Sequence, residues 1–376
     1  MKLITFVGTG RYEPVIYRWG EREHSTRFFS DALVEWLQPE TTCVMLTKVA
    51  RQHSNWQELE PLLRGRTEVR EVHIPDGESE QELWQIFQRI TEVVEPNDEL
   101  VFDITHAFRS LPLLTLLATA YLKQVAEVRI RYILYGAYEA RADGIAPAFD
   151  LTPFAELLDW LAAAKIFLTT GNAAELAHLL EAVQDEAWRA RLAQPPRNLK
   201  SLANTLTEVS NHLLLNRVPL LAESARRLQS HLDPRHEAHA EIAVWAPPLA
   251  PLLERIAQSY SAFANDDLRT QAHLIEWYHR HGHVMQAVTL AREWVISYRL
   301  VQQGKDWQDR GAREQMEQHL NAHAVQDALW SKVRDLRNDL AHCGFGRAKA
   351  QVLDVQSIQQ RTREVVEEIL STVRSE

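Results

Sequence analysis

Short apolar runs alternate with amphipathic stretches in the amino-terminal part of the chain, and this alternation stops near Pro153. Apolar runs ended by glycine or polar residues are typical of strands buried on both faces of a sheet. The runs that predict strands are 2–7, 42–47, 69–74, 99–104 and 128–135, and the stretches that predict helices are 25–37, 55–63, 79–94 and 110–124. Such alternation favours a parallel sheet covered by helices on both faces. We therefore predict an α/β domain over residues 1–152, with a turn at Asp143-Gly144 joining an added hairpin.

From residue 153 onward the pattern changes to apolar residues at helical spacing, broken at Pro195-Pro196 and Pro247-Pro248. This predicts an all-α region over residues 153–376. The two cysteines, Cys43 and Cys343, indicate a reducing compartment without a disulfide framework. The apolar run from residue 110 to 122 is too short to span a bilayer, so we expect a cytoplasmic protein with no membrane contact.

Two groups of histidines in the helical region raise the question of a metal site. They are His231, His236 and His239, and His279, His281 and His283. Neither group has cysteine or well-spaced carboxylate partners, and histidines that alternate around a glycine are typical of a polar turn. We predict no metal site.

Two loops follow predicted strands at the edge where a parallel sheet binds its ligands. Their notable residues are Gly8, Thr9, Gly10 and Tyr12 in the first loop and Thr105, His106, Arg109 and Ser110 in the second. Glycines let a backbone approach phosphate closely, and hydroxyls, an arginine and a helix amino-terminus suit an anion. We predict that both loops bind one ligand. Ordinary turn chemistry is the alternative for each loop by itself.

Familiar nucleotide and hydrolase motifs do not fit these loops. A dinucleotide fingerprint would need a third glycine where the chain has Glu13, and no Walker-type Gly-Lys-Ser/Thr follows. The sequence also lacks a Gly-x-Ser-x-Gly nucleophile elbow.

Near the carboxyl end, Arg337, Asn338 and His342 combine a fixed cation, an amide and a titratable imidazole ahead of Gly344, a predicted helix C-cap. Arginine can hold a phosphate bidentately, and histidine can transfer protons near neutral pH. Together they could cleave RNA without a metal, through attack of a ribose 2′-hydroxyl on the adjacent phosphate. Five residues of helix place Arg337 and His342 about 140° apart, so a second copy of the helix could complete the pocket.

The spacing by itself has a simpler explanation, a helix end whose histidine complements the dipole. Similar pairs occur at Arg18/His24, Arg66/His73, Arg226/His231 and Arg313/His319. The net charge of −10 argues against indiscriminate nucleic-acid binding, so any RNA contact must be local. The helix over residues 284–294 has a polar face, where Glu293 could pair with Arg337 or simply be solvated.

The motifs, taken in order, resemble those of a CRISPR-associated CARF–HEPN protein of type III systems. The stretches that carry this resemblance are 6–12, 103–112 and 337–342, with 282–294 similar to the helix that precedes the nuclease motif. The resemblance implies a Rossmann-like CARF sensor domain (1–152), a helical HEPN ribonuclease domain (153–376) and a cyclic oligoadenylate activator. It also implies that Arg337 and His342 are catalytic with Asn338 in support, and that the eight loop residues bind the adenylate. Ala107 departs from the family pattern, in which glycine is common.

A homodimer with a two-fold axis accommodates an even-membered ring symmetrically, so cyclic tetra-adenylate is our first expectation and the hexa-adenylate our second. The expected activity is metal-independent cleavage of single-stranded RNA that leaves 2′,3′-cyclic phosphate ends, with no cofactor beyond the activator. Two alternatives remain: a sensor that binds the adenylate without cutting RNA, and a sensor that also slowly cleaves its own ligand through Thr105, His106 and Arg109.

Overall fold

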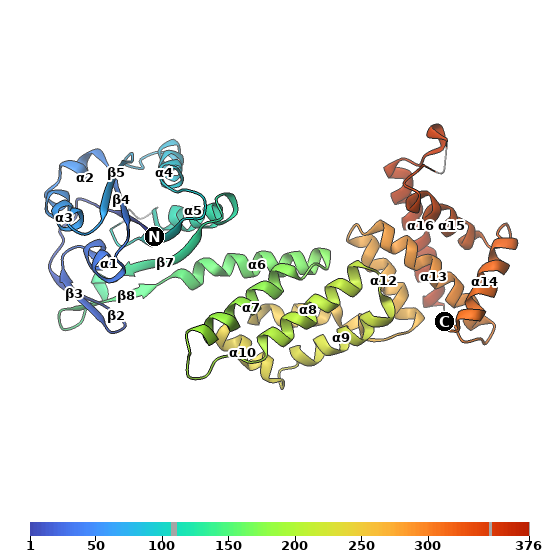
Figure 1. Ribbon diagram of the computed structural model, residues 1–376. Coiled ribbons are helices and arrows are strands. Elements are labelled where there is room, and N and C mark those ends of the chain that lie inside the picture. The colour runs from blue at the N-terminus through green and yellow to red at the C-terminus, as the bar shows by residue number, and fades with distance from the viewer. Residues whose placement is uncertain (107–110, 346–347, 376) are drawn as a thin grey trace. The chain divides into compact units, whose positions relative to one another are not determined.

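The computed structural model describes residues 1–106, 111–345 and 348–375 (Figure 1). It divides into two compact units, Met1–Asp159 and Trp160–Glu376. Arg109 and Ser110 of the predicted ligand loops, and Ala107 beside them, lie outside the described residues. The two units are described separately below.

The first unit is built on an eight-stranded sheet in the order β3-β2-β8-β7-β6-β1-β4-β5. The strands are β1 (Lys2–Phe6), β2 (Val15–Trp19), β3 (Arg22–Thr26), β4 (Thr41–Leu46), β5 (Glu68–His73), β6 (Glu99–Asp103), β7 (Arg129–Gly136) and β8 (Ile145–Asp150). From β5 to β7 all neighbours are parallel, as the sequence predicts. The sheet as a whole is mixed, because β8 runs antiparallel to β7 and β2 runs antiparallel to β3.

Strands β2 and β3 are absent from the sequence prediction, which wrongly extended a helix back to Ser25. They form a hairpin in which Trp19 pairs with Arg22 across a turn that begins at Gly20 with a φ of 59°. Val15 and Tyr17 point into the core while Arg18 is exposed, so the alternation is real but short. Because the exposed strand β3 is mostly polar, it lacks the apolar run by which the other strands are recognised.

Helices cover both faces of the sheet, as predicted. They are α1 (Phe29–Leu37), α2 (Lys48–Gln52), α3 (Ser54–Arg64), α4 (Glu80–Glu92) and α5 (Leu111–Val125). Strand β1 shows how one buried strand serves two cores, because Leu3 packs with α1 and α3 while its neighbour Ile4 packs with α4 and α5. Ser79 caps α4 by accepting the N–H of Glu82 at 3.2 Å, as its capping-box sequence predicts.

The remainder of the chain is helical, also as predicted. Its helices are α6 (Thr152–Thr170), which contains the boundary between the units, α7 (Ala174–Arg189), α8 (Leu199–Leu214), α9 (Val218–Leu232), α10 (Glu237–Trp245), α11 (Leu253–Ser261), α12 (Leu268–Arg280), α13 (Val284–Gln302), α14 (Arg310–Ala322), α15 (Ala328–Ala341) and α16 (Val355–Arg374). One hydrophobic core extends from Trp160 to Ile369. Within the described ranges, no helix is long and apolar enough to cross a membrane.

The carboxyl-terminal helices are anchored by two buried tryptophans. Trp294 of α13 is fully buried, and its indole N–H donates to the carbonyl oxygen of Leu268 at 2.8 Å. Trp330 of α15 is likewise fully buried, and the Arg292 guanidinium lies over its ring at 5.4 Å. Helices α13 and α15 are therefore fixed against each other, which defines the position of the helix that carries Arg337.

Candidate ligand site and nuclease motif

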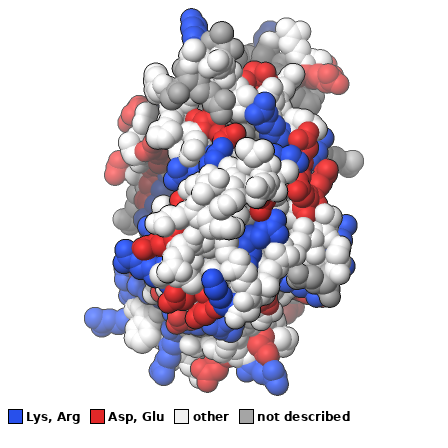
Figure 2. Space-filling model, turned by 90° about the vertical axis from the view of Figure 1, so that its right-hand side faces the viewer, with Lys and Arg blue, Asp and Glu red and all other residues white. Residues whose placement is uncertain are grey.

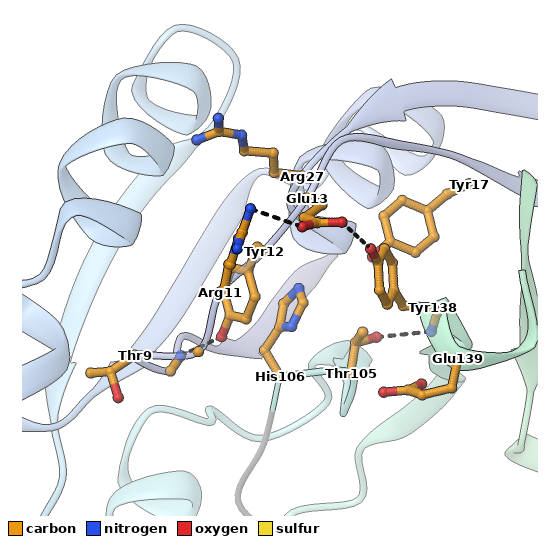
Figure 3. A pocket seen from close by; sticks show the side chains of 13 residues that line it. Thr9, Arg11, Tyr12, Glu13, Tyr17, Arg27, Thr105, His106, Tyr138 and Glu139 are labelled. Carbon is orange, nitrogen blue, oxygen red and sulfur yellow. Dashed lines mark hydrogen bonds and ion pairs between the residues drawn. The ribbon is translucent and has the colours of Figure 1, made fainter. Parts of the chain in front are cut away.

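A pocket of about 350 Å³ lies at the carboxyl-terminal edge of the first unit's sheet. Its lining includes Gly8, Thr9, Gly10 and Tyr12 from the first predicted loop and Thr105 and His106 from the second (Figure 3). The structure therefore brings together six of the eight residues predicted for the ligand. The two that remain, Arg109 and Ser110, are outside the described residues.

Asn55, at the start of α3, supports the first loop through hydrogen bonds. Its side-chain amide donates to the carbonyl oxygens of both Gly8 and Gly10, each at 2.9 Å. These two bonds satisfy carbonyl groups that a flexible glycine loop would otherwise leave to water. Asn55 thereby fixes the shape of the loop.

Tyr12 and His106 connect the two loops. Their rings stack with centroids 4.0 Å apart and an interplanar angle of 25°, and the Tyr12 hydroxyl accepts the N–H of Gly8 at 2.9 Å (Figure 3). Burial raises the pKa of Tyr12 to about 12, so the phenol stays protonated. The same desolvation lowers the pKa of His106 to about 4. At neutral pH the pocket therefore presents an uncharged imidazole.

The Nε2 atom of His106 is buried and has no hydrogen-bond partner among the described residues. A buried polar atom without a partner costs about 1–3 kcal/mol, and a ligand that bonds to it removes that cost. His106 is therefore suited to hydrogen-bond a ligand rather than to carry positive charge.

Beneath the second loop lies Asp103, which is fully buried at the end of β6. Burial raises the pKa of its carboxyl group, although the Thr105 N–H (2.9 Å) and the Thr5 hydroxyl (2.7 Å) donate to it and act in the opposite direction. The Thr105 hydroxyl in turn accepts the N–H of Gly136 at 2.8 Å. This network attaches the start of the loop to three strands.

Several residues of the pocket are not among the predicted site residues: Arg11, Glu13, Tyr17, Arg27, Tyr138 and Glu139. Glu13 accepts the Tyr138 hydroxyl at 3.0 Å and pairs with Arg11 at 3.3 Å (Figure 3). Arg11 lies within the first predicted loop and Glu13 directly follows it, so their positions in the sequence could have suggested them. Tyr17 lies on β2, and Tyr138 and Glu139 lie in the short turn after β7 (Tyr138–Ala140). Neither element has a sequence pattern that predicts it.

The predicted catalytic residues lie at the end of α15. Arg337 is half-buried, Asn338 and His342 are exposed, and the Arg337 guanidinium donates to the Asn338 side-chain oxygen at 3.3 Å. No hydrogen bond joins Arg337 to His342 in the part of the chain that the structure describes. This separation is expected of residues about 140° apart on one helix.

The end of α15 differs in detail from the prediction. His342, not Gly344, is the C-cap, and the first left-handed residue is Cys343, with a φ of 53°. Gly344 follows with a φ of 76°, and its N–H donates to the Asp339 carbonyl oxygen at 3.0 Å. The reversal thus takes two left-handed residues, and glycine occupies the second.

Glu293 does not pair with Arg337, contrary to one reading of the sequence. Its carboxylate accepts Arg292 at 2.5 Å and Arg313 at 2.8 Å. The face shown in Figure 2 carries Lys/Arg and Asp/Glu side chains in small interspersed groups rather than in one continuous basic surface. Any RNA contact on that face is therefore local, in line with the net charge of −10.

Three of the histidines in these two groups have structural partners, while the Nδ1 atoms of His231 and His279 are buried without a hydrogen-bond partner among the described residues. His236 accepts the N–H of Ala238 at 3.1 Å and so caps α10, while His281 and His283 stack on Trp277 with centroids 4.2 and 5.6 Å away. Among the described residues, no three His, Cys, Asp or Glu side chains are grouped so as to hold a metal ion.

Two family models match the chain, one over most of the first unit and one over about half of the second. Residues 2–139 match the family model described as the CARF domain of the CRISPR system endoribonuclease Csx1. Residues 156–266 match the model described as the second domain of the CRISPR-associated protein MJ1674. The chain belongs to the CRISPR-associated CARF-domain proteins. The pocket described above therefore lies in the CARF domain, and an all-helical region follows it.

The individual proteins that this chain resembles share low sequence identity with it. The chain is 24% identical over 205 residues to the CRISPR-associated protein MJ1674 of Methanocaldococcus jannaschii, a match that covers 54% of this chain and 29% of the relative. It therefore spans less than a third of that protein's length. Among solved structures, Enterococcus italicus Csm6 bound to cyclic hexa-2′-fluoro-hexa-dAMP is similar with a TM-score of 0.42 and 12% identity, over 99% of this chain and 94% of that one.

Proposed function

We propose that this CARF-domain protein is a cyclic-oligoadenylate-activated, metal-independent endoribonuclease of type III CRISPR defence. The observation that supports the proposal most is the meeting of both predicted loops in one pocket of a CARF domain. In this proposal residues 1–152 are the sensor, and residues 153–376 form a HEPN-type ribonuclease domain.

The pocket suits an adenylate better than a bare phosphate. Its described lining has two arginines, Arg11 and Arg27, but also two carboxylates, Glu13 and Glu139, so it holds no surplus positive charge. The aromatic surface of Tyr12 and the neutral His106 favour stacking and hydrogen bonding to a base. Gly8, Thr9 and Gly10 offer a close backbone approach to the linking phosphates, and we assign Thr105, Arg109 and Ser110 to the opposite side of the ring.

We assign RNA cleavage to Arg337 and His342, with Asn338 in support. His342 would take the proton of the ribose 2′-hydroxyl as it attacks the adjacent phosphorus, and Arg337 would stabilise the charge on the phosphate oxygens. The proton that His342 has taken then goes to the leaving 5′-oxygen, and the products carry 2′,3′-cyclic phosphate and 5′-hydroxyl ends. Because the two side chains diverge on one helix, we infer that the centre forms between two copies of α15 in a homodimer.

Activation in this proposal is a shift of population. The ligand must bind the cutting-competent arrangement of the dimer more tightly than the inactive one, since equal affinity would change nothing. An even-membered ring matches the two-fold axis, so cyclic tetra-adenylate is the first candidate activator and cyclic hexa-adenylate the second.

Cleavage of single-stranded RNA in EDTA, with and without cyclic tetra-adenylate, tests the proposal. We expect cutting only with the ring present, and its loss in His342→Ala while calorimetry shows unchanged ring binding. Undiminished cutting by His342→Ala would refute the assignment of the catalytic residue. Ring binding without RNA cleavage under any activator would instead favour a regulator that does not cut. This candidate is supported by the Arg337 guanidinium, which donates to Asn338 and not to His342 within the described residues of one chain.

A third candidate is slow cleavage of the ring by the sensor itself. Thr105 and His106 line the ligand pocket, which favours this reading, but His106 is neutral and buried. Degradation of the ring that survives in His342→Ala would separate this activity from the ribonuclease.

A further inference from the structure

The helical unit contains a second pocket, of about 440 Å³, that the proposed reaction does not use. It is lined by residues of α12, α13 and α14 together with Val218, Pro219 and Asp266, and we call it the α12–α14 pocket. Val218 to Asp266 belong to the segment that matches the MJ1674 second domain, whereas α12 to α14 follow that segment. The pocket thus lies at the join between two parts of one compact unit, where small-molecule sites are common.

The most informative residue in this pocket is Gln271 on α12. Its side chain lines the pocket, is only 5% exposed, and makes no hydrogen bond to any other residue in the described ranges. Because this amide lines the pocket without a protein partner, its carbonyl and NH₂ groups offer one acceptor and two donors to an occupant. The occupant should therefore present a donor and an acceptor close together.

Charge in the pocket argues against a phosphate. Arg313 is already occupied, because it donates to Ser297 Oγ (2.7 Å), the Trp307 carbonyl oxygen (2.8 Å) and Glu293 (2.8 Å). The carboxylates of Glu293 and Asp266 outnumber this one cation among the lining residues. An anion would meet net negative charge at close range, and a cation would have to compete with Arg292 and Arg313 for Glu293, so the occupant is a neutral group.

The remaining lining favours a flat ring. Trp307, between α13 and α14, is half-buried and lines the pocket together with the apolar Leu290 and Val218. An indole stacks on any nucleobase, and a glutamine amide pairs with the adjacent donor and acceptor on a base edge. A flat, neutral group of this kind with paired hydrogen-bonding positions is a nucleobase.

We propose that the α12–α14 pocket binds one unstacked nucleobase, held by the Gln271 amide and the Trp307 ring. The pocket also connects to the helix that carries the nuclease motif, because Glu293 bonds to Arg292, which lies over Trp330 of α15. A base held here would fix an RNA strand to the helical unit. The assignment of this base to an RNA strand rests on the proposed ribonuclease function. The binding of a base in the pocket does not depend on that function.

Equilibrium binding to the His342→Ala variant of residues 1–376 tests this inference without interference from RNA cleavage. Labelled single-stranded RNA, an abasic ribose-phosphate oligomer of the same length, and free adenosine and uridine are the probes. Gln271→Leu and Trp307→Leu are each made in this background, and Gln318→Leu on the exposed face of α14 is the matched control. Circular dichroism and melting curves check that each variant is folded.

We expect Gln271→Leu to weaken RNA binding by roughly 10-fold, the range for loss of one amide–base pairing, and to leave abasic binding unchanged. Trp307→Leu should have a similar effect through lost stacking, and Gln318→Leu none. If the substitutions weaken binding of free nucleosides but not of RNA, the pocket binds a base that belongs to a free ligand and not to an RNA strand. Equal weakening with the abasic oligomer, no weakening with any probe, or no binding of RNA and nucleosides by the parent would overturn the inference.

Failure of the ribonuclease proposal would look different. If the wild-type protein never cut RNA, the ribonuclease proposal would be wrong. Base binding by the parent and by Gln271→Leu could still be compared, so the inference about the pocket would be tested independently.

Discussion

The ring of Tyr12 stacks on the imidazole of His106 with centroids 4.0 Å apart, while the Tyr12 hydroxyl accepts the N–H of Gly8 at 2.9 Å. One side chain thus joins the loop after β1 to the loop after β6. A ligand that moves one loop should therefore also move the other, so the two loops should respond to the ligand together.

Asn55 should control how well this pocket is formed. In Asn55→Ala the carbonyl groups of Gly8 and Gly10 lose their two hydrogen bonds, so we expect about 1–2 kcal/mol lower stability and weaker ring binding. Urea unfolding and calorimetry with cyclic tetra-adenylate measure the two effects. Gln57→Ala, on the exposed face of the same helix, is the control and should change neither. Unaltered affinity in Asn55→Ala would mean that the loop keeps its shape without this support.

The buried His106 predicts a particular pH dependence of stability. Its pKa falls from 6.5 to about 4 on folding, so between these values the unfolded chain binds a proton that the folded chain does not. The free energy of unfolding therefore rises as the pH increases from about 4 to 6.5. The rise from this one group is about 3 kcal/mol in total and is complete above pH 6.5.

In His106→Asn this contribution disappears. The free energy of unfolding, measured in urea at pH 4.5 and pH 7, should differ less between the two pH values than in the wild type. Asp103 is present in both proteins, so the opposite effect of its raised pKa cancels in the comparison. Equal pH differences in the two proteins would show that His106 is not buried in the neutral form.

Ring size follows from symmetry. Calorimetry with cyclic tri-, tetra- and hexa-adenylate should give the tightest binding for the tetra-adenylate, then the hexa-adenylate, with one ring for two chains. Tightest binding of the three-membered ring, or one ring for each chain, would contradict the two-fold arrangement.

Gly344 should be required for the chain reversal after α15. A Cβ there would lie 2.9 Å from Val352 Cγ1, and the φ of 76° disfavours side chains. We expect Gly344→Ala to cost roughly 1–3 kcal/mol in unfolding free energy. Gly304→Ala is the matched control, because its φ of 68° is similar but no atom lies within 4 Å of the added Cβ. A cost no larger than that of the control would show that Val352 gives way.

Local pattern was sufficient for most of the fold but not for the edges of the site. The strands at the centre of the sheet are buried on both faces, so their apolar runs identify them. Strand β3 and the turn at Tyr138 are half-exposed and form through pairing with β2 and β8, which no short window of sequence reveals. The same holds for Asn55, whose role depends on where α3 begins beneath a loop far away in the chain.

The helical unit shows a second limit. The sequence indicates Arg337, Asn338 and His342 by type and spacing. Gln271 carries no motif and is notable only because the fold places its side chain, without a protein partner, in the lining of the α12–α14 pocket. Glu293 illustrates the opposite case, since its partners Arg292 and Arg313 could not be chosen among the arginines before the helices were placed.

The central claim is that the cutting centre is shared between two ligand-bound copies, and mixing two inactive variants tests it most directly. Arg337→Ala and His342→Ala should each be inactive alone with cyclic tetra-adenylate and EDTA. Equal amounts refolded or co-expressed together should regain about a quarter of wild-type RNA cleavage, because half the dimers are mixed and each of these has one intact shared centre. No recovery in mixed dimers, or cutting by a strictly monomeric ring-bound protein, would contradict the account.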